Sequence, residues 1–126
     1  MLKSYAKGYR AEYELVHKLS KMGYMVVRTP RSGRIGLASP DIIAIKNGKI
    51  IVIEVKSRKS AFNVKEEQLK ELDEWVDKGG AVAYLGCKVA RKGWYFLKLD
   101  DVKNNRGNIG KKFIDSFGIN IENIGI

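Results

Sequence analysis

The sequence predicts an α/β protein with a mixed central β-sheet flanked by helices, in the order α-β-β-β-α-β-β. Three observations lead to this prediction. The N-terminal segment has apolar residues at helical spacing, two β-rich apolar runs are joined by Asn47-Gly48, and a second amphipathic segment precedes two further strands. At 126 residues, we expect a single domain covering residues 1–126.

The two helices are predicted from periodicity and end signals. Apolar residues recur at helical spacing over residues 4–22, and Gly23 follows as a stop. Asn63-Val64-Lys65-Glu66 resembles a capping box, which predicts a second helix from there to about Lys78, before Gly79-Gly80. The predicted strands are Tyr24–Arg28, Asp41–Lys46, Lys49–Lys56, Ala81–Cys87 and Trp94–Leu99. Residues 29–39 read as a loop, and the tail beyond Asp100 has no clear assignment.

Composition narrows the class of protein. The chain has 44% hydrophobic and 30% charged residues, which is typical of a folded globular protein rather than a disordered one. No apolar run approaches the ~18–20 residues of a membrane span. The single Cys rules out an internal disulfide and a Cys-based zinc site. We therefore expect a soluble, cytoplasmic protein with no membrane partner, acting in a host cell if its source is viral.

The net charge of +10 points to a polyanionic partner, and it is unevenly distributed. Residues 1–60 contain 13 Lys and Arg but only four acids, whereas residues 61–100 contain seven of each. The acids 66, 67, 71, 73, 74 and 77 predict an exposed acidic face on the second helix. The four acids of the basic half are Glu12, Glu14, Asp41 and Glu54.

The Asn47-Gly48 turn fixes the register of the hairpin that it joins. A two-residue type I′ turn pairs Lys46 with Lys49, so Asp41 is expected opposite Glu54. Their Cβ atoms should lie about 4.5–5.5 Å apart on one face, and strand period two adds Lys56 to that face. Like charges directly opposite destabilise a sheet, so this pair needs a compensating charge.

A divalent cation is one source of that charge, because Mg²⁺ commonly binds one or two carboxylates and leaves positions for water and phosphate oxygens. The alternative is an ion cluster of Asp41, Glu54 and Lys56 with no chemical role. Glu12 lies at the border of the first helix's apolar stripe, either as a third site acid or as a residue that snorkels to water. Glu14 is expected to point to solvent.

Two stretches of the sequence resemble a known protein family. Ser39-Pro40-Asp41, twelve residues and then Glu54-Val55-Lys56 resemble the PD-(D/E)xK motif of metal-dependent nucleases. With the longer stretch Val26–Lys59, preceded by Lys7–Leu15, the chain resembles the archaeal-type Holliday junction resolvases over about residues 4–100. The resemblance implies a restriction-endonuclease-like core and a homodimer that cuts four-way DNA junctions symmetrically with Mg²⁺, with Mn²⁺ able to substitute.

The resemblance also implies roles for individual residues. Asp41, Glu54 and Glu12 match the metal ligands, and Lys56 matches the motif lysine. Arg28 matches the arginine that ends the first strand, and Ser32 matches a loop serine implicated in activity. Gln68 lies where related nucleases often carry a helix glutamine beside the site.

These residues lead to the hypothesis of Mg²⁺-dependent phosphodiester hydrolysis, in which Lys56 orients or activates the attacking water. The backbone of the DNA would be gripped by Lys7, Arg10, Arg28, Arg31, Arg34, Arg58 and Lys59. Two alternatives stay open: a nuclease of the same core acting on DNA ends or flaps, and a non-catalytic DNA-binding module. His17 is expected to be exposed and Cys87 to be a small buried hydrophobe.

Overall fold

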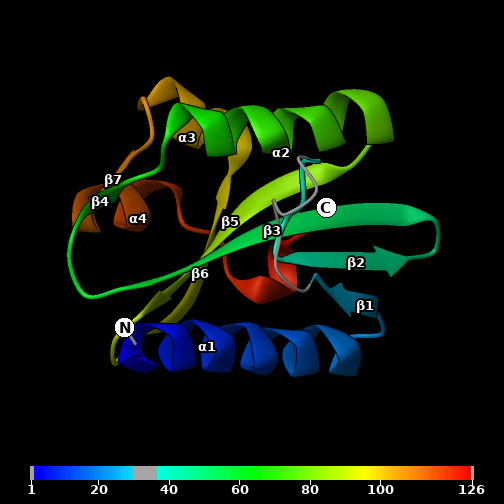
Figure 1. Cartoon of the computed structure of the whole chain (residues 1–126), viewed down its shortest axis with the longest axis horizontal. Helices are drawn as coiled ribbons and strands as arrows, with labels where there is room; N and C mark the ends of the chain where they lie inside the picture. Colours follow the sequence, from blue (N-terminus) through cyan, green and yellow to red (C-terminus); the bar gives the residue numbers. More distant parts are fainter. Residues whose placement is uncertain (1, 30–36, 126) are drawn as a thin grey trace.

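The computed structural model describes residues 2–29 and 37–125, with side chains from Tyr9 onward. Three layers are stacked in it (Figure 1). Helix α1 (Leu2–Lys21) covers one face of a five-stranded sheet, and α2 (Glu66–Gly79) and α3 (Leu99–Asn104) cover the other. The predicted α/β fold with a mixed sheet is confirmed.

The sheet consists of β1 (Met25–Arg28), β2 (Ile42–Lys46), β3 (Lys49–Arg58), β5 (Val82–Val89) and β6 (Gly93–Lys98). Its strand order is β1-β2-β3-β5-β6. Strands β3 and β5 run parallel, which the α2 crossover allows, and the other neighbours are antiparallel. All five strands were expected, and their ends differ from the predicted ones by at most two residues.

The β2–β3 hairpin has the predicted register. Lys46 pairs with Lys49, and Ile42 pairs with Ile53. Asn47 and Gly48 have φ values of 51° and 79°, as a type I′ turn requires. The turn therefore fixes which residue of β3 lies beside the start of β2, the point beyond which β3 has no β2 partner.

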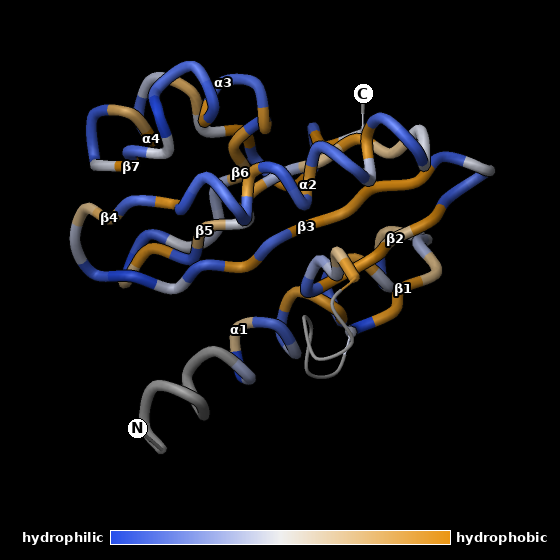
Figure 2. Tube along the Cα trace, turned by 45° about the horizontal axis from the view of Figure 1, so that its top comes forward, coloured by the Kyte–Doolittle hydropathy of each residue, from blue (hydrophilic) through white to orange (hydrophobic). Residues whose placement is uncertain are grey.

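Strands β2 and β3 contain runs of hydrophobic residues (Figure 2), and both faces of the sheet are covered by helices or chain segments. On the α1 side, Leu15 and Leu19 pack on Ile42, Ile51 and Ile53, together with other buried residues of this cluster. On the α2 side, the buried cluster contains Val52, Leu69, Leu72, Leu85 and Leu97, among others. The strand faces thus follow the expected alternation, and β3 carries residues into both cores.

The capping box predicted at residue 63 is wrong. Helix α2 begins at Glu66, and Lys65, which precedes it, makes no capping side-chain hydrogen bond. Asn63 instead belongs to β4 (Phe62–Asn63), where its side-chain amide donates to Arg106 O (3.2 Å) and Asn108 Oδ1 (2.9 Å). A long-range strand pairing therefore uses the side chain that the local pattern assigned to the helix.

The unassigned tail completes the fold. Strand β7 (Asn108–Ile109) pairs antiparallel with β4. It is followed by α4 (Lys111–Phe117) and by a 3₁₀ turn, Ile121–Asn123. Ile119 bridges to Phe96 of β6, and Ile124 is buried on the α1 side of the sheet. Among the described residues, there is no helix both long and apolar enough to cross a membrane.

Gly107 gives a test of the contact between the tail and the start of α2. Its φ is +81°, and a Cβ there would lie 2.2 Å from Val64 O. We expect Gly107→Ala to lower the free energy of unfolding by about 3 kcal/mol, from backbone strain plus this collision. Urea unfolding measures the change. Gly80→Ala is the control, because Gly80 has φ +69° and open space, so only about 1 kcal/mol should be lost. Equal losses in the two variants would contradict the assigned contact.

Candidate active site

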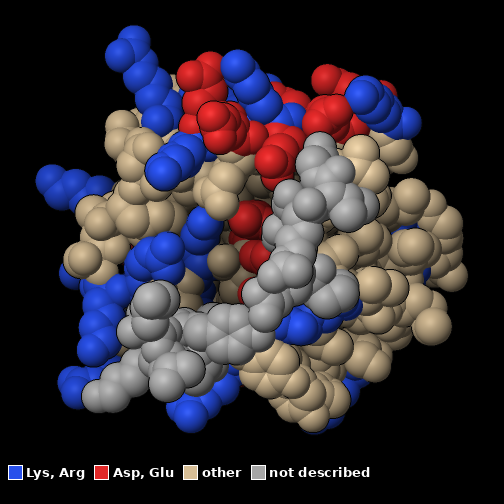
Figure 3. All heavy atoms as spheres, viewed as in Figure 1, with Lys and Arg blue, Asp and Glu red and all other residues tan. Residues whose placement is uncertain are grey.

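The candidate site lies where β3 continues beyond the start of β2. From Glu54 to Arg58, β3 pairs with β5 alone, because β2 begins only at Ile42. Asp41 immediately precedes β2, beside this unpaired edge. Figure 3 shows acidic atoms at the bottom of a hollow near the centre of this face, with Lys and Arg on one side and an acidic band above.

The backbone of β3 holds the Asp41 carboxylate. Its Oδ2 accepts a hydrogen bond from the Val55 N–H at 2.8 Å, at the place where the next ladder bond would form. The backbone of Asp41 is held in turn by Thr29, whose N–H donates to Asp41 O at 2.9 Å. Asp41 therefore has a fixed position directly beside Glu54, as the register predicts.

Gln68 of α2 connects the acid and the lysine of β3. Its Nε2 donates to Glu54 Oε2 at 3.3 Å, and its Oε1 accepts from Lys56 Nζ at 3.1 Å. An amide serves both partners because it carries a donor and an acceptor on one carbon. The side chain thus holds the Glu54 carboxylate and the Lys56 ammonium on the same face of β3.

Glu12 approaches from α1 on the other side. Its Oε1 accepts from Arg28 Nε at 2.8 Å, and the exposed fractions of the two side chains are 17% and 30%. The Arg28 guanidinium also lies 4.6 Å from the centre of the Tyr9 ring, a cation–π contact. The last residue of β1 is therefore attached to the helix through both a charge and an aromatic ring.

The pKa values of Glu12, Asp41 and Glu54 are all raised, chiefly by burial. Burial raises the pKa of Glu54 to about 8, and the nearby Asp41 charge adds to the rise. Burial also raises the pKa of Asp41, against the Val55 N–H and Lys56, which lower it. Burial and the Asp41 charge raise the pKa of Glu12, with Arg28 opposing them. Removing carboxylates from water while placing them together disfavours their charged forms.

The donor set of Asp41 and Glu54 fits a hard divalent cation. Two partly buried carboxylates with raised pKa values supply oxygen ligands, and Lys56 compensates their negative charge only in part. Across residues 2–29 and 37–125, no three His, Cys, Asp or Glu side chains are gathered closely enough to hold a metal by themselves. Glu12 is engaged by Arg28 instead, so its part as a third ligand stays a prediction.

The structure brings together Glu12, Arg28, Asp41, Glu54, Lys56 and Gln68. Ser32, Arg31 and Arg34, and the side chain of Lys7, lie outside the described residues. Arg10, Arg58 and Lys59 are exposed, as a DNA-contacting role requires. His17 is exposed and Cys87 is buried, as expected, and burial raises the pKa of the Cys87 thiol to about 12.

Some supporting contacts were not predicted from the sequence. Trp75 Nε1 donates to Ala38 O at 3.0 Å, which fixes the approach of the chain to Asp41. Glu14 was expected to point to solvent, but it is half-buried and forms an ion pair with Lys88 and accepts from Trp94 Nε1 at 3.2 Å. Strand period two places Trp94 on the same sheet face as Phe96, and both belong to the cluster on the α1 side.

Taken together, the mixed sheet, the acid before β2 and the Glu-x-Lys of β3 define a restriction-endonuclease-like fold. A solved bacterial homing endonuclease, I-Ssp6803I, has the same architecture with a TM-score of 0.58 at 17% identity, over 84% of this chain and 76% of that one. This likeness concerns the fold alone.

The family can be stated more closely. The model of the archaeal Holliday junction resolvase (Hjc) family matches residues 3–124, and the chain belongs to this family. Crossover junction endodeoxyribonuclease Hjc of Sulfolobus acidocaldarius is 39% identical over 77% of this chain and 69% of that protein. The structure of the Holliday junction resolvase Hjc of Archaeoglobus fulgidus matches with a TM-score of 0.80 at 28% identity, over 89% and 93% of the two chains.

The pKa of Glu54 predicts how metal-free protein responds to pH. The folded chain keeps the Glu54 proton up to a pKa of about 8, whereas the unfolded chain loses it near the ordinary glutamate pKa of 4.5. Because the folded state then binds more protons, its stability falls as pH rises from about 4.5 to about 8. We expect Glu54→Gln to reduce this decline to the part that Asp41 and Glu12 contribute, and to be more stable than the unchanged protein at pH 8 by a few kcal/mol, measured by urea unfolding with chelator present.

The control for that measurement is Glu71→Gln, which makes the same chemical change on the exposed surface of α2. It should leave the decline with pH intact. A decline that persisted unchanged in Glu54→Gln would mean that this carboxylate is not the group that destabilises the folded state.

Proposed function

We propose that this protein is a structure-selective endonuclease that resolves four-way DNA junctions by Mg²⁺-dependent phosphodiester hydrolysis. It would act as a homodimer that nicks two strands symmetrically, in the cytoplasm of its cell or of a host cell. The observation that carries the proposal is the partly buried Asp41–Glu54 pair with Lys56 beside it. The names of the relatives, crossover junction endodeoxyribonuclease and Holliday junction resolvase, support the choice of substrate.

In this proposal, Asp41 and Glu54 hold Mg²⁺, or Mn²⁺ in its place, and Glu12 joins them if Arg28 turns from it to the DNA. The metal would supply Lewis-acid stabilisation of the charge that develops on the phosphate. The chain's own contribution is a preformed carboxylate pair, because Val55 and Gln68 fix its two members before any ion arrives. Such preorganisation reduces the reorganisation needed at the moment of reaction.

Lys56 would act on the water and the phosphate. Gln68 accepts one hydrogen bond from its ammonium group, which leaves other N–H donors for a phosphate oxygen or for the attacking water. In the reaction, the attacking water loses a proton as its oxygen bonds to phosphorus, one bridging P–O bond breaks, and the leaving oxygen gains a proton. Arg28 pairs with Glu12, and it would exchange this carboxylate for a phosphate oxygen when DNA binds. The planar fork of a guanidinium matches the geometry of a phosphate.

Exposed cations beside the site would bind the DNA backbone. Arg10, Arg58 and Lys59 serve this purpose among the described residues, and Lys7, Arg31 and Arg34 are proposed with them. Contacts of this kind position a duplex without reading its sequence, so selectivity for a junction would come from its shape. We expect binding to weaken steeply as salt increases.

An exposed apolar surface supports the homodimer. Met25 and Val27 of β1 and Ile45 of β2 are 78%, 56% and 40% exposed, and Met25 pairs directly with Ile45. These three side chains form the β1–β2 apolar patch, on the sheet face that α2 covers farther along. A second copy would remove the patch from water, and a two-fold dimer would present one active site to each of two strands.

The central experiment compares a synthetic four-way junction with a linear duplex of matched sequence, with Mg²⁺ and with chelator. We expect symmetric nicks near the branch point that depend on Mg²⁺. Equal cutting of the duplex would favour a nuclease acting on other DNA structures. Absence of cutting in every condition, with binding retained, would favour a DNA-binding module.

Asp41→Asn tests the assignment of the site. It removes one charged metal ligand while keeping the shape of the side chain, so Mg²⁺-dependent cleavage should fall by about a hundredfold or more. Junction binding, measured by gel shift without metal, should be kept. Asp77→Asn on the exposed surface of α2 is the matched control and should cut normally. Cleavage at the normal rate by Asp41→Asn would remove this residue from the mechanism.

Val27→Lys tests the β1–β2 apolar patch. A lysine at this half-exposed position should fold normally but would place a charge in the dimer interface, so the mass measured by light scattering should fall to that of a monomer. Phe117→Lys is the control, since Phe117 is similarly exposed (45%) but lies on α4. A Val27→Lys protein that stays dimeric would place the interface elsewhere.

A further inference from the structure

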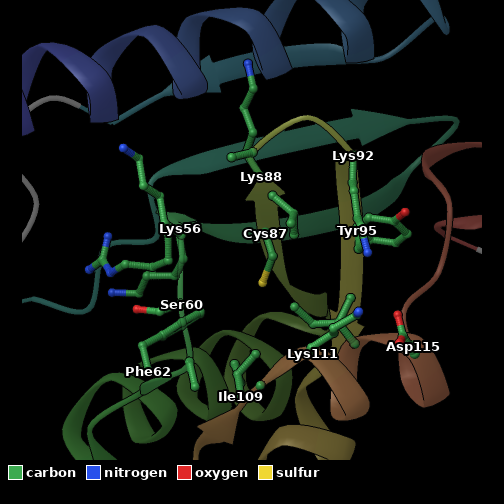
Figure 4. Close-up of a pocket in the computed structure, with 17 residues that line it drawn as sticks. Lys56, Ser60, Phe62, Cys87, Lys88, Lys92, Tyr95, Ile109, Lys111 and Asp115 are labelled. Atoms are coloured by element: carbon green, nitrogen blue, oxygen red, sulfur yellow. The ribbon is translucent and has the colours of Figure 1, made fainter.

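A cavity of about 290 Å³ lies beside the candidate active site. Its walls come from the end of β3 with the segment that follows it, from β5 and β6, and from α4 (Figure 4). Lys56 lines it, so the cavity and the proposed catalytic lysine share a wall. The volume is close to the lower end of small-molecule sites, about 300–1,000 Å³, so it suits one small ligand.

The floor of the cavity is apolar. Cys87 and Ile109 are only 2% and 1% exposed, and Figure 4 shows both beside the same hollow. The rings of Phe62 and Tyr95 and the side chain of Ile114 also line it. A floor of this kind favours a flat, weakly polar group over a bare inorganic ion.

The rim, by contrast, is strongly basic. Six of the described lining residues are Lys or Arg, and Asp115 is the one acid among them. Lys88 is directed toward α1, where it pairs with Glu14, but the ion pairs found among the described residues do not include Arg58, Lys59 or Lys111. The Arg58 guanidinium lies 5.6 Å from the centre of the Phe62 ring, so a cation meets the apolar wall at the rim.

We propose that this cavity binds a single nucleotide unit, with its base on the apolar floor and its phosphate on the cations of the rim. A nucleotide combines a flat ring with a dianionic or monoanionic phosphate, which is the same pairing of properties that floor and rim present. A phosphate of the DNA backbone alone would use the rim and leave the floor without a partner. This site is separate from the carboxylate pair and adds a second point of contact to the proposed function.

Two sources can supply such a unit: an unstacked nucleotide of the DNA substrate or a free mononucleotide. A four-way junction has a branch point where base stacking is interrupted, and unstacking a base there costs less than within a duplex. The DNA source therefore rests on the proposed function, whereas the free nucleotide does not. The experiment has one arm for each source.

The first arm uses equilibrium dialysis of the full chain, without metal, against three probes: deoxyadenosine 5′-monophosphate, inorganic phosphate and deoxyadenosine. The nucleotide should bind at least about tenfold more tightly than either of its halves, because only it engages both floor and rim. Inorganic phosphate that bound as tightly as the nucleotide would overturn the proposal, as would the binding of none of the three probes.

Lys111→Ala tests the location of the site. Lys111 is exposed and lines the cavity, so the variant should fold and should bind the nucleotide about tenfold more weakly, as expected for one lost charged hydrogen bond. Lys112→Ala removes the same charge from the next residue of α4, which does not line this cavity, and should bind normally. Equal weakening in the two variants would show a general charge effect and would overturn the proposal.

The second arm measures binding of a four-way junction and of a matched duplex by the same two variants. If the unit comes from DNA, Lys111→Ala weakens junction binding more than duplex binding, and the mononucleotide competes with the junction. If the unit is free, Lys111→Ala leaves junction binding unchanged while its nucleotide binding is weakened. Failure of the proposed nuclease activity would leave the first arm intact, so the two failures are distinguishable.

Discussion

The constraint on which the site depends is that the fold holds two carboxylates side by side in partly buried positions. Asp41 and Glu54 meet because the hairpin register ends at that level, and the Asp41 charge raises the pKa of Glu54 in addition to the effect of burial, whereas the hydrogen bond with Glu54 lowers the pKa of Asp41. Only partial compensation is available, from the Val55 N–H, Lys56 and Gln68. A neutral pair would suit the stability of the sheet better, and the proposed divalent cation would supply the charge that this arrangement lacks.

The parts of the fold that the sequence predicts well are those fixed by local geometry. The turn at Asn47-Gly48 needs two positive φ values, and strand period two then determines every partner back to Ile42. Gly80 ends α2 in a left-handed conformation, as the Gly79-Gly80 pair indicates. The tail could not be predicted in this way, because β7 exists only through its pairing with β4, some 45 residues earlier. The same pairing made Asn63 a misleading capping signal.

The residues of the site also fall into those that local geometry predicts and those that depend on tertiary packing. Asp41, Glu54 and Lys56 follow from register and from strand alternation, so their proximity can be derived without any knowledge of a relative. The pairing of Glu12 with Arg28 joins a helix to an edge strand, and no local rule connects residues 16 apart in those two elements. Gln68 was indicated by resemblance alone, since its reach to two residues of β3 depends on how α2 lies over the sheet. The support that Trp75 gives to Ala38 had no signal in the sequence.

The distribution of charge around the site favours one orientation of an approaching polyanion. All four acids of residues 1–60 are engaged within the protein: Glu12 with Arg28, Glu14 with Lys88, and Asp41 and Glu54 at the carboxylate pair. The basic half therefore presents mostly cations outward, while α2 carries an exposed acidic face (Figure 3). A polyanion that approaches this face is repelled along α2 and attracted on the opposite flank. For a nuclease, that asymmetry would draw the DNA backbone across the hollow in which the carboxylates lie, so that the same fold that confines the negative charge also orients the substrate over it.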